Sequence, residues 1–257
     1  MPDSTAASPP AAAADAVIVG AGRGLRMHSA VPKQYLLLDG KPVLAHTLQA
    51  FDACDSIRRI HLVVPAADIH RCRRDILAAI SFQKPILLTA GGRRRQDSVR
   101  NGIRSIRRPP RAVVVHDGVR PFVRPDQISA CVAAALEDGA CILGLPVADT
   151  LKTVGPGGIV DKTVDRRRIW TAQTPQAFVW PVIWEAHEAA ARDGYEGTDD
   201  ASLVERLGKK VRVIGGSRMN IKITTTEDLW MARALTARLS RQVRSGGTGQ
   251  DDGGAAG

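Results

Sequence analysis

The chain has 257 residues, of which 44% are apolar and 24% charged, a composition typical of a globular protein with one or two domains. Its 36 Lys and Arg residues outnumber 26 Asp and Glu residues, and the resulting net charge of +10 favours nucleic acid, anionic lipid or phosphorylated small molecules as partners. The sequence has neither an apolar stretch of membrane-spanning length nor the basic start of a signal peptide, so we expect a cytoplasmic protein without a membrane partner. The cysteines lack metal-binding spacing, which predicts reduced, mostly buried thiols.

Strands and helices are predicted to alternate along most of the chain. Residues 1–15 are rich in Ala and Pro and residues 242–257 in Gly, so both are predicted to be flexible tails on one domain over 16–241. In chain order, buried strands are predicted at 16–20, 59–64, 86–89, 112–116 and 140–145, with helices at 42–54, 68–80, 96–106 and 125–137. This order indicates an α/β fold whose open, mostly parallel sheet has helices on both faces.

A β-hairpin is predicted to interrupt this alternation. Strand patterns at 150–154 and 159–164 flank the tight-turn sequence Gly155-Pro-Gly-Gly158. An isolated hairpin is unstable without a surface to pack on. We therefore expect this hairpin to pack against another protein surface, with a second subunit as the candidate. Beyond it, helices are predicted at 181–192, 199–207 and 227–239, and a strand at 211–214.

A glycine-rich segment follows the first predicted strand. It reads Gly20-Ala-Gly-Arg-Gly-Leu-Arg-Met27 and continues with Pro32-Lys33-Gln34. Backbone N–H groups of such a turn can surround phosphate oxygens, and Arg26 and Lys33 place cations beside it. The dinucleotide pattern G-x-G-x-x-G fails because position 25 is Leu, and the pattern G-x-x-x-x-G-K-[ST] is absent. A plain strand-to-helix connection with solvated bases is the alternative.

A second candidate segment, His116-Asp-Gly-Val-Arg-Pro121, ends a predicted strand at the sheet edge where α/β proteins bind ligands. Asp117 can hold Mg²⁺ and Arg120 can hold an anion. The alternative is an Asp–Arg pair that only ties the loop. His116 is predicted to be structural, because histidines at strand ends are often buried core residues.

A third segment, Gly91-Gly-Arg-Arg-Arg-Gln-Asp-Ser98, also joins a predicted strand to a predicted helix. Ser98 and the Gly92 backbone could donate hydrogen bonds to a nucleotide. Asp97 or Ser98 could equally serve only to cap the helix. The run of three arginines is more typical of a solvated face than of three phosphate contacts.

Together with later segments, these motifs resemble one family. In chain order they are G-A-G-x-G-x-R-M with P-K-Q, G-G with D-S-V, V-H-D-G-V-R-P, P-V-x-D-T-L-K, T-V-D-R, T-P-Q, T-D-D-A-S and N-I-K-I-T. Over about residues 16–239 the chain is similar to the 2-C-methyl-D-erythritol 4-phosphate cytidylyltransferases. The resemblance implies a Rossmann-like fold with a protruding hairpin arm. It also implies transfer of CMP from CTP to methylerythritol phosphate with Mg²⁺, in non-mevalonate isoprenoid biosynthesis.

The resemblance further implies roles for individual residues. Arg26 and Lys33 match cations that stabilise the transition state at the CTP α-phosphate, and Arg166 and Lys222 are also assigned to catalysis. Nucleotide-binding positions are matched by Ala21, Gly22, Gly92, Ser98 and Gly118, and positions for the phosphorylated acceptor by Asp117, Arg120, Thr150, Arg166, Thr174 and Lys222. Asp117 is also the implied metal ligand. The hairpin, within 147–169, corresponds to an arm that crosses to the partner subunit of a homodimer.

The chemistry fits the residue types that the chain offers. A phosphate monoester is mostly a dianion at neutral pH and needs no protein nucleophile, so cations and backbone amides that position and neutralise phosphates suffice. A ribitol 5-phosphate cytidylyltransferase stays open as an alternative. An inactive sugar-phosphate binding module is disfavoured because Arg26 and Lys33 are both present. A nucleic-acid partner is not expected, because only 4% of residues are aromatic and no nucleic-acid-binding module is recognisable.

Overall fold

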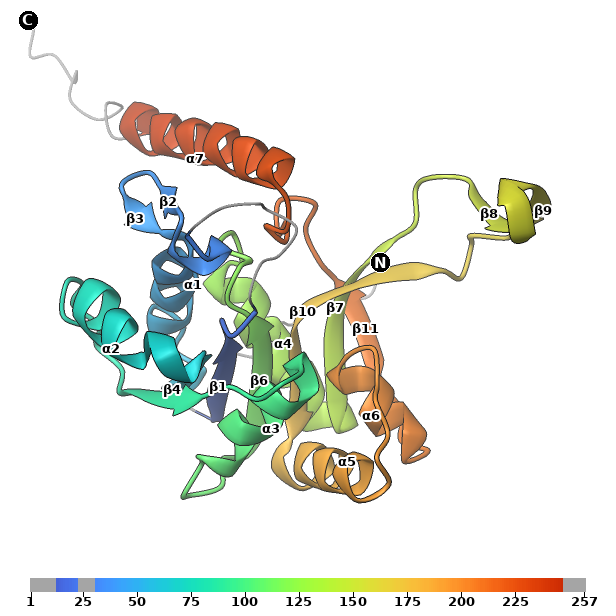
Figure 1. Ribbon diagram of the computed structural model, residues 1–257, viewed down its shortest axis with the longest axis horizontal. Coiled ribbons are helices and arrows are strands. Elements are labelled where there is room, and N and C mark those ends of the chain that lie inside the picture. The colour runs from blue at the N-terminus through green and yellow to red at the C-terminus, as the bar shows by residue number, and fades with distance from the viewer. Residues whose placement is uncertain (1–12, 23–30, 247–257) are drawn as a thin grey trace, which may run out of the picture.

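Seven strands form the central sheet of the computed structural model, which describes residues 13–22 and 31–246, with side chains to residue 241 (Figure 1). The strand order is β11-β7-β10-β6-β1-β4-β5. The strands are β1 (Ala14–Val19), β4 (Ile57–Val64), β5 (Ile86–Ala90), β6 (Ala112–Asp117), β7 (Ala140–Pro146), β10 (Trp170–Val179) and β11 (Arg212–Gly215). Within this sheet β10 alone is antiparallel to its neighbours. The predicted mostly parallel sheet is confirmed.

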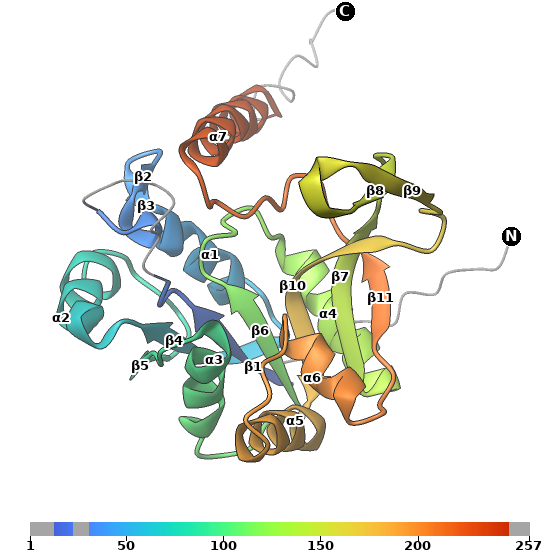
Figure 2. The same cartoon turned by 45° about the vertical axis from the view of Figure 1, so that its right-hand side comes forward.

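Helices cover both faces of the sheet, as predicted (Figure 2). One face carries α1 (Val43–Asp52), α2 (Ile69–Cys72) and α4 (Pro125–Asp138), and the other α3 (Arg95–Arg104), α5 (Trp180–Arg192) and α6 (Asp200–Arg206). In β1, Ala16 and Ile18 join the first core while Val17 and Val19 join the second, because successive side chains of a strand point to opposite faces. A strand buried on both faces therefore reads as one apolar run.

The strand β10 is not predicted from the sequence, although it is ten residues long. Its pattern is broken at Thr174-Pro175, where the register with β7 shifts between Gln173 and Gln176. Proline lacks an N–H and is tolerated inside a sheet mainly at such irregularities. Thr174 lies at this irregularity, beside the end of β6. Its hydroxyl accepts a hydrogen bond from the Asp117 N–H at 3.1 Å.

Several boundaries differ from those predicted. Regular structure reaches into both predicted tails, because β1 begins at Ala14 and α7 (Thr226–Gly246) runs past residue 241. The rest of those tails, 1–12 and 247–257, lies outside the described residues. The predicted helix 68–80 is divided into a 3-10 turn (Ala66–Asp68), α2 and a π-helical turn (Arg73–Leu77). Cys72 and Ile76 are both fully buried in this segment.

The predicted hairpin projects from the body as an arm (Figures 1 and 2). Its strands, β8 (Leu151–Val154) and β9 (Val160–Val164), form a separate two-stranded sheet. They are joined through a 3-10 turn over Pro156–Gly158. Val154, Ile159 and Val160 are each more than half exposed on this arm. Because such a hairpin gains little stability alone, its contact with a second subunit stays a prediction that the exposed apolar residues favour.

The expectations for membranes and cysteines can also be compared with the structure. In the part of the chain that the structure describes, no helix combines the length and apolar character needed to cross a bilayer. Cys54, Cys72, Cys131 and Cys141 are all buried and free, as predicted.

Candidate active site

A pocket of about 690 Å³ opens where β1, β5 and β6 end, the edge at which parallel sheets bind ligands. The segments that follow these strands supply much of its lining. Site residues expected from the sequence that lie together in this pocket are Ala21, Gly22, Lys33, Gly92, Ser98, Asp117 and Lys222. The first candidate glycine segment therefore faces the other two across one cavity.

A second hollow of about 300 Å³ adjoins this pocket. Arg120 and Thr174, which the sequence assigns to a phosphorylated acceptor, both line it. The pocket and the hollow share three charged residues, Arg95, Asp117 and Lys222. The geometry is thus that of two neighbouring sites that meet at one charged cluster.

Asp117 is the centre of this cluster. Arg95 Nε donates to its Oδ1 at 2.9 Å, Lys222 Nζ lies 2.8 Å from Oδ2, and Arg120 Nε lies 3.8 Å from the same oxygen. Burial raises the pKa of Asp117, but the charges of Arg95 and Lys222 outweigh it and hold that pKa below its ordinary value. The carboxylate is therefore ionised and surrounded by positive charge.

Buried neighbours fix the backbone around Lys222. Ile223 is fully buried, and its N–H donates to the loop after β6 at 2.9 Å. The Asn220 side chain donates to the Thr174 carbonyl at 2.8 Å, while the Asn220 carbonyl accepts from Arg120 Nη1 at 2.7 Å. These contacts join the segment before α7 to both β6 and β10, and they hold Lys222 at the boundary between the two hollows.

Gly92 and Ser98 also line the pocket. The Gly92 N–H donates to Ser98 Oγ at 3.0 Å, and Ser98 Oγ donates to the Arg94 carbonyl at 3.0 Å. Asp97 accepts from the Arg94 N–H at 3.1 Å and so caps α3, as one of the sequence alternatives predicts. A Cβ on Gly92 would lie 2.4 Å from Asp97 Cβ, so only glycine fits here without a shift.

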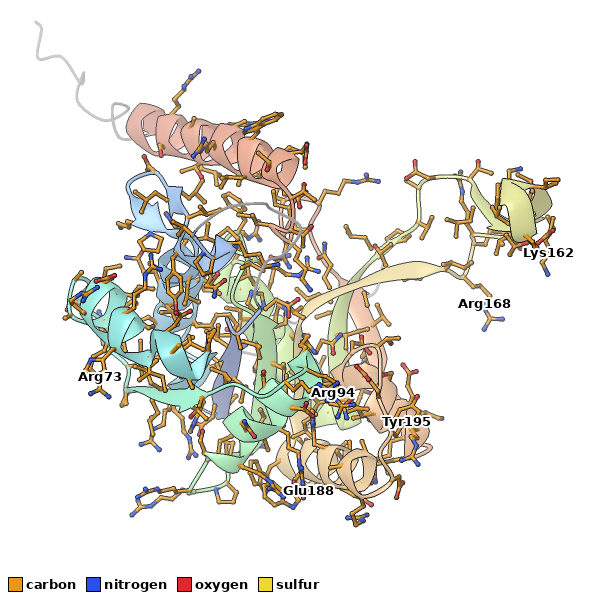
Figure 3. All side chains as sticks on the ribbon, in the orientation of Figure 1. Arg73, Arg94, Lys162, Arg168, Glu188 and Tyr195 are labelled. Carbon is orange, nitrogen blue, oxygen red and sulfur yellow. The ribbon has the colours of Figure 1, made fainter. Side chains whose placement is uncertain are left out.

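Three predicted site residues lie outside both hollows. Gly118 is buried behind Asp117, and a Cβ there would lie 2.8 Å from Leu44 Cδ1. Thr150 and Arg166 are exposed on or beside the arm. Figure 3 shows Lys162 and Arg168, neighbours of Arg166 in the chain, well away from Arg94 at the pocket. A single chain therefore does not bring Thr150 and Arg166 to the pocket, and Arg26 lies outside the described residues.

His116 has the structural role that the sequence predicts. It is fully buried, its ring centroid lies 5.0 Å from that of Phe51, and its Nε2 lies 3.3 Å from the Arg120 carbonyl. Burial lowers the pKa of His116 to about 3, so the ring is neutral and packs as a core residue.

Arg95 is a site residue that the sequence does not single out. Arg93 and Arg94 are exposed, which agrees with the solvated-face interpretation, but both also line the larger pocket, so a phosphate contact stays open. Arg95 differs because it is the first residue of α3 and bridges two carboxylates, Asp117 and Asp200. The sequence feature that could have identified Arg95 is its position. The first turn of a helix that follows a strand end faces the edge of the sheet at which ligands bind.

Asp117 is also the residue that could hold a metal. Within the described residues, no group of three or more His, Cys, Asp and Glu side chains could hold an ion. Mg²⁺ is often held by one or two carboxylates together with substrate phosphates and water, and a carboxylate has lone pairs beyond those that Arg95 and Lys222 use. This donor set fits a cation that arrives with a phosphorylated ligand.

The fold and these adjoining charged sites define a nucleotidyltransferase, an enzyme that moves a nucleotidyl group between phosphate-bearing molecules. More narrowly, the chain belongs to the 2-C-methyl-D-erythritol 4-phosphate cytidylyltransferase family, whose model matches residues 14–238. It is 49% identical over 220 residues to the enzyme of that name from Syntrophus aciditrophicus, covering 86% of this chain and 94% of the relative. It is 46% identical over 223 residues to that from Geobacillus kaustophilus, covering 87% and 96%.

Solved structures agree with this membership. The 4-diphosphocytidyl-2C-methyl-D-erythritol synthase from Anaerococcus prevotii matches with a TM-score of 0.78 at 32% identity, covering 88% of this chain and 97% of that chain. The 2-C-methyl-D-erythritol 4-phosphate cytidylyltransferase from Thermus thermophilus matches with a TM-score of 0.71 at 32% identity, covering 87% and 98%. The expected Rossmann-like fold is confirmed.

Proposed function

We propose that the protein transfers the CMP group of CTP to 2-C-methyl-D-erythritol 4-phosphate, as a cytoplasmic enzyme of non-mevalonate isoprenoid biosynthesis. A phosphate oxygen of the acceptor attacks the α-phosphorus of CTP. The bond from that phosphorus to the oxygen that bridges to the β-phosphate breaks, and pyrophosphate leaves with the electron pair. The observation that carries this proposal is the pair of hollows that share Arg95, Asp117 and Lys222.

The larger pocket would hold CTP. The Gly22 segment offers backbone N–H groups to the nucleotide. The Gly92 segment lines the same pocket with its own N–H donated to Ser98 Oγ, while Lys33 and Lys222 bring positive charge to the phosphates. By family resemblance Arg26 joins Lys33 at the α-phosphate. These groups are positioned before the reaction, so they stabilise the charge that develops on the phosphoryl oxygens without having to reorganise.

The smaller hollow would hold the phosphate of the acceptor beside Arg120, Thr174 and Lys222. This phosphate is already nucleophilic at neutral pH, so the task of the protein is to bring two anions together. Thr150 and Arg166 would complete the acceptor site from the arm of a second subunit. Mg²⁺ would be held by Asp117 and the CTP phosphates, and it would supply further positive charge there.

Pyrophosphate release in steady-state assays tests this function. With CTP and Mg²⁺, we expect a much higher kcat/KM for 2-C-methyl-D-erythritol 4-phosphate than for ribitol 5-phosphate. A preference for ribitol 5-phosphate would instead identify the sister activity. No release with either acceptor would reject a cytidylyltransferase of this kind.

Substitution of Gly92 by alanine should weaken CTP binding. The new Cβ would lie 2.4 Å from Asp97 Cβ. Overpacking of this kind forces the loop to shift and costs about 1–3 kcal/mol of free energy. If the loop moves away from the nucleotide, KM for CTP rises about tenfold, while KM for the acceptor changes little. Gly215→Ala in β11 serves as the control for loss of glycine alone, because a Cβ at Gly215 has no neighbour within 4 Å and Gly215 lines neither hollow. Equal KM values for CTP in G92A and G215A would contradict the proposed loop contact.

Substitution of Arg166 by alanine should raise KM for the acceptor by about 10- to 100-fold. This is the loss of affinity that corresponds to the free energy of one hydrogen bond to a charged group. If the arm acts in the partner subunit, a mixture of Arg166→Ala and Lys33→Ala chains should regain activity. In a mixed dimer, the intact pocket of one chain meets the intact arm of the other. Random pairing gives about a quarter of the wild-type sites. No regain in a preparation shown to contain mixed dimers, or a monomer by light scattering, would contradict the arm exchange.

A further inference from the structure

Arg95 joins the site carboxylate to a second buried carboxylate. Its Nε donates to Asp117 Oδ1 at 2.9 Å, and its Nη1 donates to Asp200 Oδ2 at 2.8 Å. Asp200 is the first residue of α6, is 1% exposed, and lies 3.1 Å from Nε2 of the buried His187 on α5. One guanidinium thus uses both arms of its planar fork to join β6 to α6.

Burying the ionised carboxylate of Asp200 away from water costs free energy unless nearby groups compensate its charge. Burial raises the pKa of Asp200, but the charge of Arg95 and the hydrogen bond from His187 outweigh it and hold that pKa below its ordinary value. A buried carboxylate of this kind is tolerated when it is paired and hydrogen-bonded. Asp200 lines neither the larger pocket nor the acceptor hollow, and of its two charged or titratable partners, Arg95 and His187, only Arg95 lines them.

We propose that Asp200 is a positioning residue that acts through Arg95 on Asp117. This inference rests on the proposed function, in which Asp117 is the carboxylate between the two substrates. The Asp200 carboxylate forms an ion pair with one side of the Arg95 guanidinium. It thereby fixes the orientation of the Nε–H toward Asp117 and limits how much positive charge Arg95 presents to that carboxylate. Loss of the charge leaves Arg95 free to turn and to pair fully with Asp117.

A second buried triad provides a matched control. Asp15 is fully buried, accepts from Arg58 Nε at 2.6 Å and lies 3.4 Å from His61 Nε2. Like Asp200, it pairs with one partly exposed arginine and one buried histidine. It stands near the start of β1, at the edge of the sheet opposite the pocket. Asp15→Asn therefore removes an equivalent buried charge without touching the proposed site.

The test is a double-mutant cycle of Arg95→Gln, Asp200→Asn and the two combined, with pyrophosphate release as the assay. We expect Asp200→Asn to lower kcat about tenfold, the size typical of an outer-shell partner, with KM for CTP little changed. Because Asp200 acts only through Arg95, Asp200→Asn should cost nothing further once Arg95 is glutamine. Asp200→Glu should restore part of kcat, and Asp15→Asn should lower thermal stability but keep kcat.

Three outcomes would overturn the inference. They are an unchanged kcat in Asp200→Asn, independent losses that multiply in the double variant, and an equal fall of kcat in the folded Asp15→Asn control. If Asp200→Asn fails to fold, Arg95→Lys replaces it, because lysine lacks the planar fork that spans both carboxylates. Wild-type kcat in that variant would also overturn the inference.

Asp117→Asn separates this inference from the proposed function. If Asp117→Asn keeps wild-type kcat, the assignment of Asp117 to the site fails, and the inference fails with it. If Asp117→Asn is nearly inactive while Asp200→Asn is unaffected, the proposed site stands and only the role of Asp200 is rejected.

Discussion

Substitution of Lys33 by alanine is expected to lower kcat by about 10²–10³, the usual cost of one lost charge donor to a transition state, with little change in KM for CTP. Lys33 begins the short turn Lys33–Tyr35, which is anchored by the buried side chains of Gln34 and Tyr35. This anchoring presents the ammonium group to the pocket where the α-phosphate is expected. A contact that strengthens only as charge develops lowers kcat and kcat/KM together when it is removed.

Lys41→Ala is the matched control for Lys33→Ala. Lys41 is exposed, bonds to Gln49 Oε1 at 3.4 Å and does not line the pocket, so kcat and KM should stay at wild-type values. Steady-state kinetics with CTP varied at saturating acceptor provide the measurement. A near-normal kcat in Lys33→Ala, or a rise in KM for CTP with no loss of kcat, would reject a role in the transition state.

Substitution of Lys222 by methionine is expected to reduce kcat by a similar factor, about 10²–10³, and to raise KM for both substrates. Its ammonium group lies 2.8 Å from Asp117 Oδ2 and lines both hollows. Methionine keeps most of the apolar stem but removes the charge that each phosphate would share. The rise of both KM values distinguishes this variant from Lys33→Ala.

Lys209→Met provides the comparison for Lys222→Met. Lys209 is an exposed lysine whose Nζ lies 3.8 Å from Glu185, outside both hollows, so the same change of side chain should leave all kinetic constants unaltered. Kinetics with each substrate varied in turn would give the two KM values separately. A change confined to one substrate would show that Lys222 serves one site rather than the boundary between them.

The α/β sheet and much of the pocket can be predicted from the sequence because their signals are local. Apolar runs mark strands buried on both faces, and glycines at strand ends mark turns that approach a ligand. The segment at Gly92 shows how far this argument reaches, since the sequence gives it two alternatives. Asp97 caps α3, as one alternative predicts. Gly92 and Ser98 both line the pocket, and their contact with a nucleotide stays a prediction.

Features that depend on contacts between distant segments are harder to predict. The strand β10 is hidden by Pro175, whose place in the sheet depends on a register shift against β7. Arg95 looks like one of three equivalent arginines until α6 brings Asp200 against it. Thr150 and Arg166 are exposed and line neither hollow in one chain, so the role predicted for them needs a second subunit and stays a prediction.

The most direct test of the account is phosphorus NMR of the purified protein with equimolar CTP and 2-C-methyl-D-erythritol 4-phosphate in the presence of Mg²⁺. We predict that the monoester signal and the CTP signals disappear together. Pyrophosphate and the paired signals of a diphosphate diester should appear in equal amounts, and the Lys33→Ala protein should show a strongly reduced rate. Free CMP with pyrophosphate, or CTP that stays intact while the acceptor is present, would contradict the proposed transfer.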